Sequence, residues 1–300
     1  MDYMYYPGCS QEVSNKAYDA SARNVSRALG VNLVELEDWN CCGATNYMSV
    51  RELRSFAVSA RNLALAEKAS AGKPAANGNG RDLVTVCSAC YTTLNKTNKY
   101  LEEDAKVKAR VQESLSAAGL TYKGGVRVRH LLDVIVNDVG IESVAAKAKV
   151  RLDGLRVAPY YGCQLTRPYA TFDDAEHPTT MDRLFGALGA EAVDYPVRAR
   201  CCGGMLMTTA QPVALKLAGS LLDTAAKNGA QCIVTCCPLC QFNLDAYQGD
   251  VNRLMGARFS MPVLFFTQLL GVALGLSRSD IMLGKEMVSA GKVLAPYMNA

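Results

Sequence analysis

Cys41-Cys42-Gly43 and Cys201-Cys202-Gly203 are two copies of one tripeptide, and each copy has further cysteines before and after it. In each half of the chain a single cysteine comes first, the tripeptide follows, and a Cys-x-x-Cys pair ends the series. The two sets are Cys9, Cys41, Cys42, Cys87 and Cys90, and Cys163, Cys201, Cys202, Cys237 and Cys240. This repeated order predicts an internal duplication with one site in each half.

The duplication extends to residues other than cysteine. The matched segments are Leu29-Gly30-Val31 with Leu188-Gly189-Ala190, Val84–Cys90 with Val234–Cys240, and Val126–Gly140 with Val263–Gly275, the last pair with Gln268 over His130. The interval before the last motif is longer in the first half. The Gly-, Asn- and Pro-rich stretch Gly72–Gly80 explains this difference as a surface loop insertion. Two copies of one domain are therefore expected.

Strand and helix patterns alternate along both halves, which predicts an α/β fold. Strands are expected at 2–6, 31–36, 83–86, 155–160, 191–195 and 232–235, and helices at 12–29, 50–70, 107–118, 131–139, 179–188 and 212–228. We expect two pseudo-symmetric Rossmann-like repeats at 1–150 and 151–278, and a tail at 279–300 as a candidate partner contact. Cys9 is expected just past a strand, where open α/β sheets bind ligands. Cys87 and Cys90 are expected at a helix start, where the helix dipole favours thiolate.

The composition of the chain argues against several classes of protein. The net charge is +4 without any run of basic residues, so nucleic-acid binding has no support. The longest apolar run, Val263–Leu276, has 14 residues and is too short for a membrane span. Met1–Tyr6 lacks the features of a secretion signal, so we expect a cytoplasmic protein. In reducing cytosol, repeated cysteines favour metal binding or redox chemistry over a disulfide framework.

Two pairs of arginines, Arg127 with Arg129 and Arg198 with Arg200, come nearest to a basic cluster. We interpret them as alternating exposed residues near strand ends, and a basic rim for an acidic substrate or partner is the alternative. Trp39 is the only tryptophan. It is expected to pack beside the site, and the alternative is that it shields a cofactor from water.

Five cysteines in each half are one more than common metal sites use. A structural zinc ion and a cubane iron-sulfur cluster each take four ligands. The only histidines, His130 and His177, offer few substitutes, so one thiolate is left over in each half. An iron-sulfur cluster in each half is favoured over structural zinc. Cys232 and Cys236 lie outside the pattern and are interpreted as buried apolar filler.

The order Cys, Cys-Cys-Gly, Cys-x-x-Cys, given twice, resembles the CCG cysteine-rich domain family, and within it the B subunits of heterodisulfide reductases. Further shared features are Tyr161-Gly162-Cys163, Arg167-Pro168, Arg129-His130, Cys232–Thr235 and Pro262–Leu264. The resemblance covers the chain to about Gly275. The chain departs from the methanogen form of the family at Gly43, where proline is common, and in the Gly72–Gly80 insertion. These departures leave the disulfide substrate open.

The resemblance implies that each five-cysteine set ligates one noncubane 4Fe-4S cluster. It also implies that the two clusters face each other between the halves and cleave a disulfide, so that catalysis runs through the clusters held by Cys42 and Cys202. A ferredoxin-like iron-sulfur C subunit and a flavin-containing A subunit would deliver electrons, since the chain has no Gly-x-Gly-x-x-Gly motif of its own. Two alternatives stay open: another family enzyme, acting in sulfur oxidation or disulfide formation, and an electron-transfer subunit beside succinate, lactate or glycolate oxidation.

Overall fold

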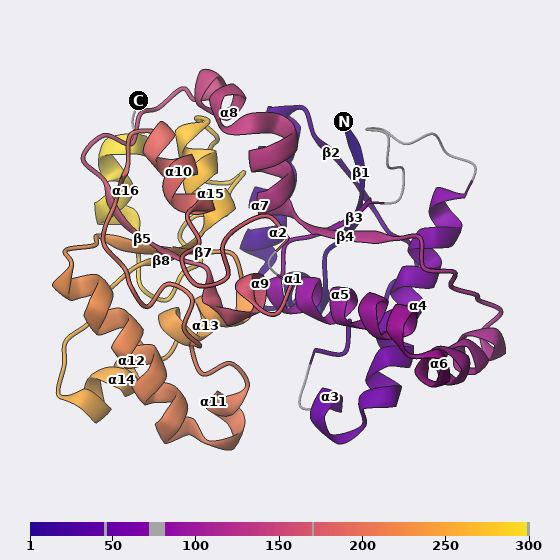
Figure 1. Ribbon diagram of the computed structural model, residues 1–300. Helices are drawn as coiled ribbons and strands as arrows, with labels where there is room; N and C mark the ends of the chain where they lie inside the picture. Colours follow the sequence, from indigo (N-terminus) through magenta and orange to yellow (C-terminus); the bar gives the residue numbers. More distant parts are fainter. Residues whose placement is uncertain (45–46, 72–81, 170, 299–300) are drawn as a thin grey trace.

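Two parallel four-stranded sheets, one from each half of the chain, carry the structure (Figure 1). The computed structural model describes residues 1–44, 47–71, 82–169 and 171–298, so the expected loop at Gly72–Gly80 lies outside the described residues. The first half contains β1 (Asp2–Tyr6), α1 (Cys9–Glu12), α2 (Lys16–Leu29), β2 (Asn32–Glu35), α3 (Tyr47–Val50), α4 (Glu52–Ser70), β3 (Asp82–Thr85), α5 (Ser88–Glu103), α6 (Ala105–Ala117), β4 (Arg127–His130), α7 (Leu131–Asp133), the π-helical turn η1 (Val134–Gly140) and α8 (Ile141–Lys147). The second half contains β5 (Arg156–Tyr160), α9 (Gly162–Thr166), α10 (Thr180–Ala187), β6 (Glu191–Ala192), α11 (Leu206–Thr209), α12 (Gln211–Lys227), β7 (Cys232–Thr235), α13 (Pro238–Asp245), α14 (Gln248–Met255), β8 (Val263–Phe265), α15 (Phe266–Ala273) and α16 (Gly291–Met298).

Both sheets have the same strand order. The first is β2-β1-β3-β4, the second is β6-β5-β7-β8, and every neighbouring pair is parallel. This confirms the predicted α/β fold with a duplicated unit. The strand order changes direction between β1 and β3 and between β5 and β7. Such switch points are where open α/β sheets bind ligands at their carboxyl ends.

The residue patterns predicted most elements to within a few residues. α2 ends where Gly30 adopts the left-handed conformation, with a φ of 83° that a side chain would strain. The helix expected over 12–29 is divided into α1 and α2, and the strand expected over 191–195 shortens to the two residues of β6. β6 is an edge strand that pairs only with β5, so little backbone bonding holds its end.

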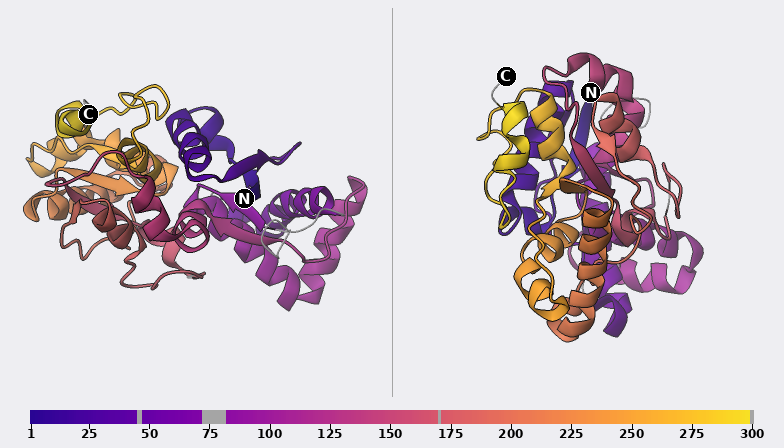
Figure 2. Two further views of the ribbon diagram at one scale, coloured as in Figure 1. Left: turned by 90° about the horizontal axis from the view of Figure 1, so that it is seen from above. Right: turned by 90° about the vertical axis from the view of Figure 1, so that its left-hand side faces the viewer.

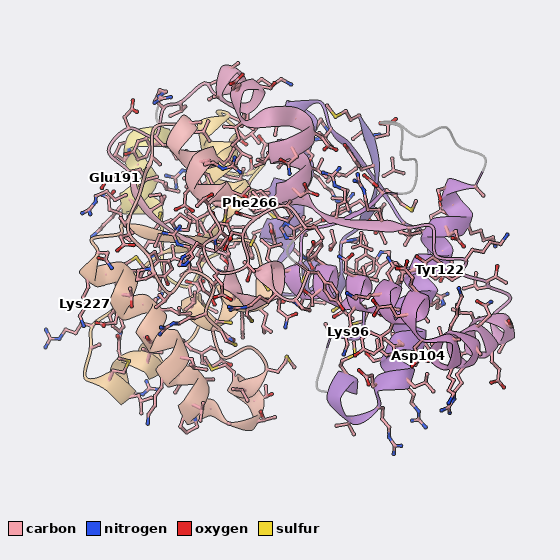
Figure 3. All side chains as sticks on the ribbon, in the orientation of Figure 1. Lys96, Asp104, Tyr122, Glu191, Lys227 and Phe266 are labelled. Atoms are coloured by element: carbon pink, nitrogen blue, oxygen red, sulfur yellow. The ribbon has the colours of Figure 1, made fainter. Side chains whose placement is uncertain are left out.

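The helix that follows the last strand of each half packs on the other half. α15, after β8, lies against α2, and α8, after β4 and η1, lies against α10 (Figure 1). Tyr18 of α2 stacks on Phe265 at 4.0 Å, and the hydroxyls of Ser21 and Thr267 are 2.6 Å apart. Phe266 lies centrally between the halves (Figure 3). One continuous core of buried residues therefore spans both units.

β4 corrects the interpretation of the first arginine pair. Arg127 is exposed, but Arg129 is buried and forms ion pairs with Asp133 (2.6 Å), Asp138 (2.5 Å) and Asp82 (3.4 Å). A buried guanidinium needs such partners, because leaving it unpaired would cost several kcal/mol. The expectation that both arginines are exposed is wrong, since Arg129 lies between Asp133 and Asp138, which follow it closely in the sequence, and Asp82 of the neighbouring strand β3.

The second arginine pair shows the same division. The side chain of Arg198 is 16% exposed and pairs with Asp182 at 2.7 Å, whereas Arg200 is exposed. One member of each pair is thus part of the fold's internal ion pairs. Neither pair forms the row of exposed residues that the sequence suggested.

The strand register also changes the alignment of the two halves. Thr85 pairs with His130 across the first sheet, and Thr235 pairs with Phe265 across the second. Thr85 and Thr235 are equivalent, because each stands two residues before a Cys-x-x-Cys motif. His130 therefore corresponds to Phe265, and the expected match of His130 with Gln268 is wrong by three residues.

The tail after residue 278 packs partly on its own chain. Leu294 of α16 is buried, Tyr297 Oη donates to Asp153 O at 3.0 Å, and Asp245 accepts a hydrogen bond from Met287 N at 2.8 Å. In Figure 2 this yellow segment lies beside the indigo amino-terminal helices. Among the described residues, none of the helices combines the length and apolarity needed to cross a membrane.

Candidate metal centre

The cysteines lie at the carboxyl ends of the strands, on both sides of each switch point. Cys9 begins α1 after β1, and Cys163 lies in α9 after β5. Cys87 and Cys237 are the N-cap residues of α5 and α13, after β3 and β7. The two Cys-Cys-Gly turns come from the loops that follow β2 and β6. This confirms that Cys87 and Cys90 stand at a helix start, and the structure gives Cys237 and Cys240 the same place.

The fold brings the five thiols of the first set into a chain of contacts. Cys9 Sγ lies 3.6 Å from Cys41 Sγ, and Cys42 Sγ lies 3.2 Å from Cys90 Sγ. Cys42 is the neighbour that most lowers the pKa of Cys41, and Cys90 partly offsets the rise in the pKa of Cys87, so these thiols are neighbours as well. Cys9 is exposed, Cys41 is partly exposed, and the other three are buried. The set therefore runs from the surface into the core.

The second set repeats this arrangement. Cys202 Sγ lies 3.6 Å from Cys240 Sγ, and Cys163 lowers the pKa of its neighbour Cys201 as Cys240 lowers that of Cys237. Here Cys201 is exposed and Cys163 is partly exposed. The structure thus gathers the ten cysteines named by the sequence pattern into two matching groups.

Each group has a stabilised thiolate near the surface. A hydrogen bond from Cys42 is the main reason that the pKa of Cys41 is lowered to about 2. In the second set a hydrogen bond from Cys163 lowers the pKa of Cys201 to about 6, and Gly203 N also donates to this sulfur at 3.3 Å. The thiolate is the form of cysteine that binds metals. Each group therefore carries a negative charge that favours binding of a ligand containing metal cations.

The two groups meet at the junction of the halves. A hydrogen bond to Cys237, which belongs to the second set, is the main reason that the pKa of Cys87 in the first set is raised. The pKa of Cys237 is lowered, first by a hydrogen bond from Cys240 and then by the one from Cys87. Ser88 Oγ donates to Cys236 O at 3.0 Å and holds the two helix starts together. The thiol groups thus lie side by side across the junction.

His130 spans the same junction, although sequence reasoning gave it no role in the site. Its Nε2 lies 3.0 Å from Val86 O and 3.2 Å from Cys236 O, and its Nδ1 accepts from Leu132 N at 3.2 Å. Two carbonyl acceptors require the proton to be on Nε2. Burial lowers the pKa of His130 to about 4, so the ring is neutral near pH 7. Cys232 and Cys236 are buried as interpreted, and Cys236 also contributes its carbonyl to this junction.

The donor set suits an iron-sulfur group, because thiolates are the soft ligands that such clusters use. Within the described part of the chain, no three His, Cys, Asp or Glu side chains are arranged to hold one metal ion. Tyr18 provides an independent observation: its hydroxyl is fully buried and has no hydrogen-bond partner among the residues that the structure describes. Burial raises the pKa of Tyr18 first, and the neighbouring Cys236 and Cys237 raise it further. A sulfur-rich group beside these thiols would accept the unused hydrogen bond, so the residues fit it.

A hollow of about 660 Å³ opens at the surface thiols of the first set. Its wall contains Cys9, Cys41, Trp39 and four carboxylates. Trp39 packs edge-to-face on Tyr6, with 5.4 Å between ring centroids, and donates from Nε1 to Glu35 at 3.1 Å. Trp39 therefore packs beside the site, as expected.

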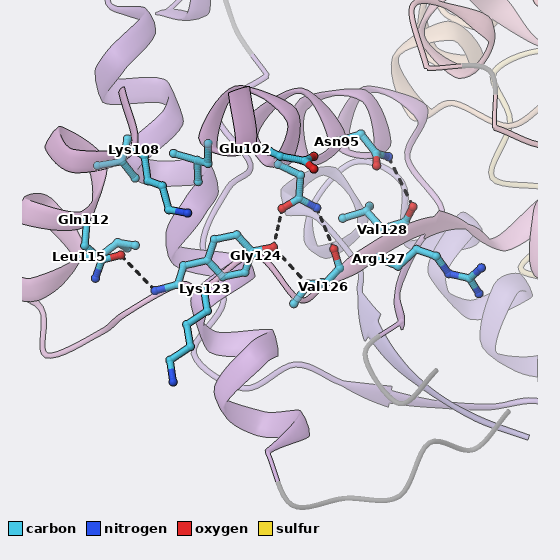
Figure 4. Close-up of a pocket in the computed structure, with 14 residues that line it drawn as sticks. Asn95, Glu102, Lys108, Gln112, Leu115, Lys123, Gly124, Val126, Arg127 and Val128 are labelled. Carbon is cyan, nitrogen blue, oxygen red and sulfur yellow. Dashed lines mark hydrogen bonds between the residues drawn. The ribbon is translucent and has the colours of Figure 1, made fainter. Parts of the chain in front are cut away.

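A second hollow, of about 490 Å³, lies between α5, α6 and β4, and its lining contains no cysteine (Figure 4). Asn98 of α5 donates to Val126 O at 2.9 Å, and in the second half Gln248 donates to Met261 O at 2.7 Å. These equivalent bonds cover the free edge beside the last strand of each sheet. The hollow therefore lies beside the edge of the first sheet and apart from the thiols.

Comparison with known proteins agrees with the duplication. The cysteine-rich domain family CCG matches residues 3–95 and again residues 157–245. The 8-methylmenaquinol:fumarate reductase membrane anchor subunit of Wolinella succinogenes is 33% identical, over 97% of this chain and 99% of its own. The B subunit of the ferredoxin/F(420)H(2)-dependent CoB-CoM heterodisulfide reductase of Methanosarcina acetivorans is 31% identical, over 97% of this chain and 95% of its own. A protein of Archaeoglobus profundus that is named as similar to the heterodisulfide reductase B subunit is 32% identical, over 93% and 92%.

A solved structure shares the fold. A hypothetical protein from Helicobacter pylori superposes with a TM-score of 0.75 at 15% sequence identity. The match covers 96% of this chain and 52% of that protein, so this chain spans about half the length of its structural relative. At this identity the likeness concerns the fold alone.

Proposed function

The chain belongs to the CCG cysteine-rich domain family, and we propose that it is the catalytic subunit of a heterodisulfide reductase-like complex. The observation that carries this proposal is that the two five-thiol groups meet at the starts of α5 and α13, which are held together by the bond from Ser88 Oγ to Cys236 O at 3.0 Å and by His130 between Val86 O and Cys236 O. A subunit that only transfers electrons can work with one redox centre. Cleavage of a disulfide separates two sulfur atoms and takes two electrons. Two similar centres side by side suit such a substrate.

We propose that the two sets of five cysteines each hold one noncubane 4Fe-4S cluster. When bound, these clusters would supply single electrons and iron atoms with high affinity for sulfur. The chain prepares the turns that carry the ligands. Gly43 and Gly203 have φ values of 83° and 95°, and a Cβ there would lie 2.9 Å from Ser55 Oγ or 2.8 Å from Ala214 Cβ. Only glycine allows each Cys-Cys-Gly turn to lie so close to its neighbouring helix.

The proposed reaction takes up two electrons and two protons. The S–S bond of the substrate breaks, and two S–H bonds form on the separated thiols. The chain contributes a junction in which Cys87 and Cys237 are buried, so bulk water has little access to it. Cys42 and Cys202 are buried as well, and each contacts the second cysteine of the Cys-x-x-Cys pair in its set. In the opposite direction the same site would form a disulfide.

Electrons must come from other subunits, because the sequence has no nucleotide- or flavin-binding motif. We propose that a ferredoxin-like iron-sulfur C subunit is the direct donor and that a flavin-containing A subunit stands behind it. Part of the tail, including the 76% exposed Met287, is free to contact such a partner.

The proposal is tested with the anaerobically purified complex and a reduced viologen dye as donor. Addition of candidate disulfides, both symmetric and mixed, should oxidise the dye, and two thiols should form for every two electrons consumed. Dye oxidation with no disulfide, or no turnover with any disulfide while the clusters are intact, would contradict the proposal.

An electron-transfer subunit of another redox complex is the second candidate, and the Wolinella relative favours it, since its name places it in a quinol:fumarate reductase. In that case the chain should copurify with a flavoprotein that reduces fumarate or oxidises succinate. Electrons should then pass between that enzyme and a quinol analogue, while disulfides have no effect on the rate.

A further inference from the structure

Two buried tyrosines make the same hydrogen bond in the two halves. Tyr6, the last residue of β1, donates from Oη to Asn40 O at 2.7 Å, and Tyr160, the last residue of β5, donates to Arg200 O at 2.7 Å. Each acceptor is the residue directly before a Cys-Cys-Gly turn. Both tyrosine side chains are fully buried. Each hydroxyl therefore ties a cysteine-bearing turn to the end of the first strand of its sheet.

The tyrosines also stand among the thiols of their own sets. Burial raises the pKa of Tyr6, and after burial the largest contribution comes from Cys90. Burial likewise raises the pKa of Tyr160, followed by contributions from Cys240 and Cys202. The two phenols thus occupy equivalent places, each next to a group of thiols and in contact with its backbone.

The residues around each phenol leave little room for adjustment. Gly8 and Gly162, two residues after the tyrosines, have φ values of 86° and 68°. A Cβ on Gly8 would lie 3.1 Å from Cys90 Sγ, and one on Gly162 would lie 3.0 Å from Cys240 Sγ. The chain after each tyrosine thus passes directly against a sulfur atom. A shift of the tyrosine or of the turn would change the spacing of the thiols.

We propose that Tyr6 and Tyr160 are positioning residues that fix the Cys-Cys-Gly turns, and thereby set how firmly each half retains its cluster. This inference rests on the proposed function only in that the two sets hold clusters. A phenol is a rigid side chain, and its hydrogen bond to the turn is partly buried in both halves. Without the hydroxyl, the carbonyl before the cysteines would lose this bond, and the second turn would be held on its far side only, by the bonds from Asn243 Nδ2 to Cys202 O and Gly204 O.

The two halves are not equally dependent on their tyrosine. Asn40 O also accepts a hydrogen bond from Asn62 Nδ2 at 2.9 Å, and Asn62 Oδ1 accepts from Asn40 N at 2.9 Å. In the part of the chain that the structure describes, Arg200 O has Tyr160 as its one side-chain donor. Ser55 and Ala214 are equivalent, because each lies against the glycine of a Cys-Cys-Gly turn. Asn62 follows Ser55 by seven residues, and the residue seven after Ala214 on α12 is Leu221, which has no side-chain amide. The second turn should therefore suffer more from loss of its phenol hydroxyl.

The test uses the anaerobically purified, cluster-loaded protein in the complex in which it is isolated. Iron release to a chelator is followed in wild type, Tyr6→Phe and Tyr160→Phe. In Tyr160→Phe half of the iron should leave about tenfold faster than in wild type, as expected for loss of one hydrogen bond of about 1.4 kcal/mol. Tyr6→Phe should change the rate by less than about threefold, because Asn62 still holds the first turn. Combining Tyr6→Phe with Asn62→Ala should bring the first half to the behaviour of Tyr160→Phe.

Tyr195→Phe is the matched control. Tyr195 is a buried tyrosine whose ring packs edge-to-face on Tyr160, with 6.3 Å between ring centroids, but its hydroxyl donates to Leu221 O at 3.1 Å and not to the carbonyl before the Cys-Cys-Gly turn. This variant should lose stability to denaturant yet keep the wild-type rate of iron release. The reduction potential of one cluster should shift in Tyr160→Phe and stay unchanged in the control.

The outcomes separate this inference from the proposed function. If wild type contains two clusters and Tyr160→Phe releases iron at the wild-type rate, the positioning role is overturned and the clusters stand. If Tyr195→Phe accelerates release as much as Tyr160→Phe, the effect is general loss of stability and the inference is again overturned. If wild type contains no iron and sulfide, the proposed function itself fails.

Discussion

His130 of the first half lies 3.2 Å from the carbonyl oxygen of Cys236 in the second half, and the same Nε2 lies 3.0 Å from Val86 O. One neutral imidazole therefore joins the ends of β3 and β7, directly before the two Cys-x-x-Cys motifs. Phe265 occupies the equivalent place in the second half and makes no such bond through its side chain. The junction of the two thiol groups is thus symmetric in its cysteines and asymmetric in this hydrogen bond.

The first prediction concerns acid stability. Because the folded pKa of His130, about 4, lies below its ordinary value of 6.5, the unfolded chain takes up the proton first as pH falls. The stability from this neutral residue is complete above about pH 6.5 and is lost as pH falls towards 4, by about 3 kcal/mol. His130→Phe, which places the Phe265 side chain at the equivalent position, should remove that part of the pH dependence. Urea unfolding at about pH 7 and about pH 4.5 measures the free energy of unfolding of both proteins. An equal loss of this free energy between the two pH values in variant and wild type would contradict the prediction.

The second prediction concerns the buried ion pairs of β4. Arg129→Met should lower the free energy of unfolding by about 3–5 kcal/mol, because three aspartates are left without their shared cation. Arg127→Met is the matched control, since this arginine is exposed and its pair with Asp82 should contribute about 1 kcal/mol or less. Chemical unfolding of both variants measures the difference. Equal losses would show that Arg129 is not the centre of the network.

The third prediction concerns metal content. If each five-cysteine set holds one 4Fe-4S cluster, the anaerobically purified chain should contain about eight irons and about eight acid-labile sulfides. Iron and sulfide analysis measures both. Two zinc ions per chain without sulfide would contradict the assignment of the cofactor.

The fourth prediction concerns assembly. The chain should copurify with an iron-sulfur protein partner, because it has cysteines for clusters but no flavin motif to receive electron pairs. A permanent association should bury well over about 1,000 Å². Affinity purification of the tagged chain under anaerobic conditions, followed by analysis of the bound proteins, tests this. A monomer that is fully active with its own bound flavin would contradict it.

Sequence reasoning reached the fold class and the grouping of cysteines because both are local or repeated signals. Strand and helix patterns follow from the period of apolar residues, and the paired motifs fix which thiols belong together. The burial of Arg129 could not be foreseen, because its partner Asp82 comes from another strand. The three-residue error in aligning His130 with Gln268 has a similar cause, since register is set by pairing across the sheet.

The sequence also did not predict that a helix near the end of each half packs on the other half. The sequence does not say which half α15 and α8 pack on, and only the three-dimensional fold shows that α15 lies against α2 and α8 against α10. Tyr6 and Tyr160 have the same explanation. Both are aromatic residues of buried strands, and their hydrogen bonds to Asn40 and Arg200 join positions more than thirty residues apart.

The most direct test of the central claim is disulfide reduction by Cys42→Ser and Cys202→Ser, made separately and assayed with an artificial electron donor. Serine is a harder and poorer ligand for iron than thiolate, so each variant should lose or alter one cluster while spectroscopy shows that the other survives. If both thiol groups act on the substrate, each variant should lose two-electron disulfide cleavage. Near-normal turnover in either variant, with its cluster shown to be missing, would contradict the account and leave that half as scaffold.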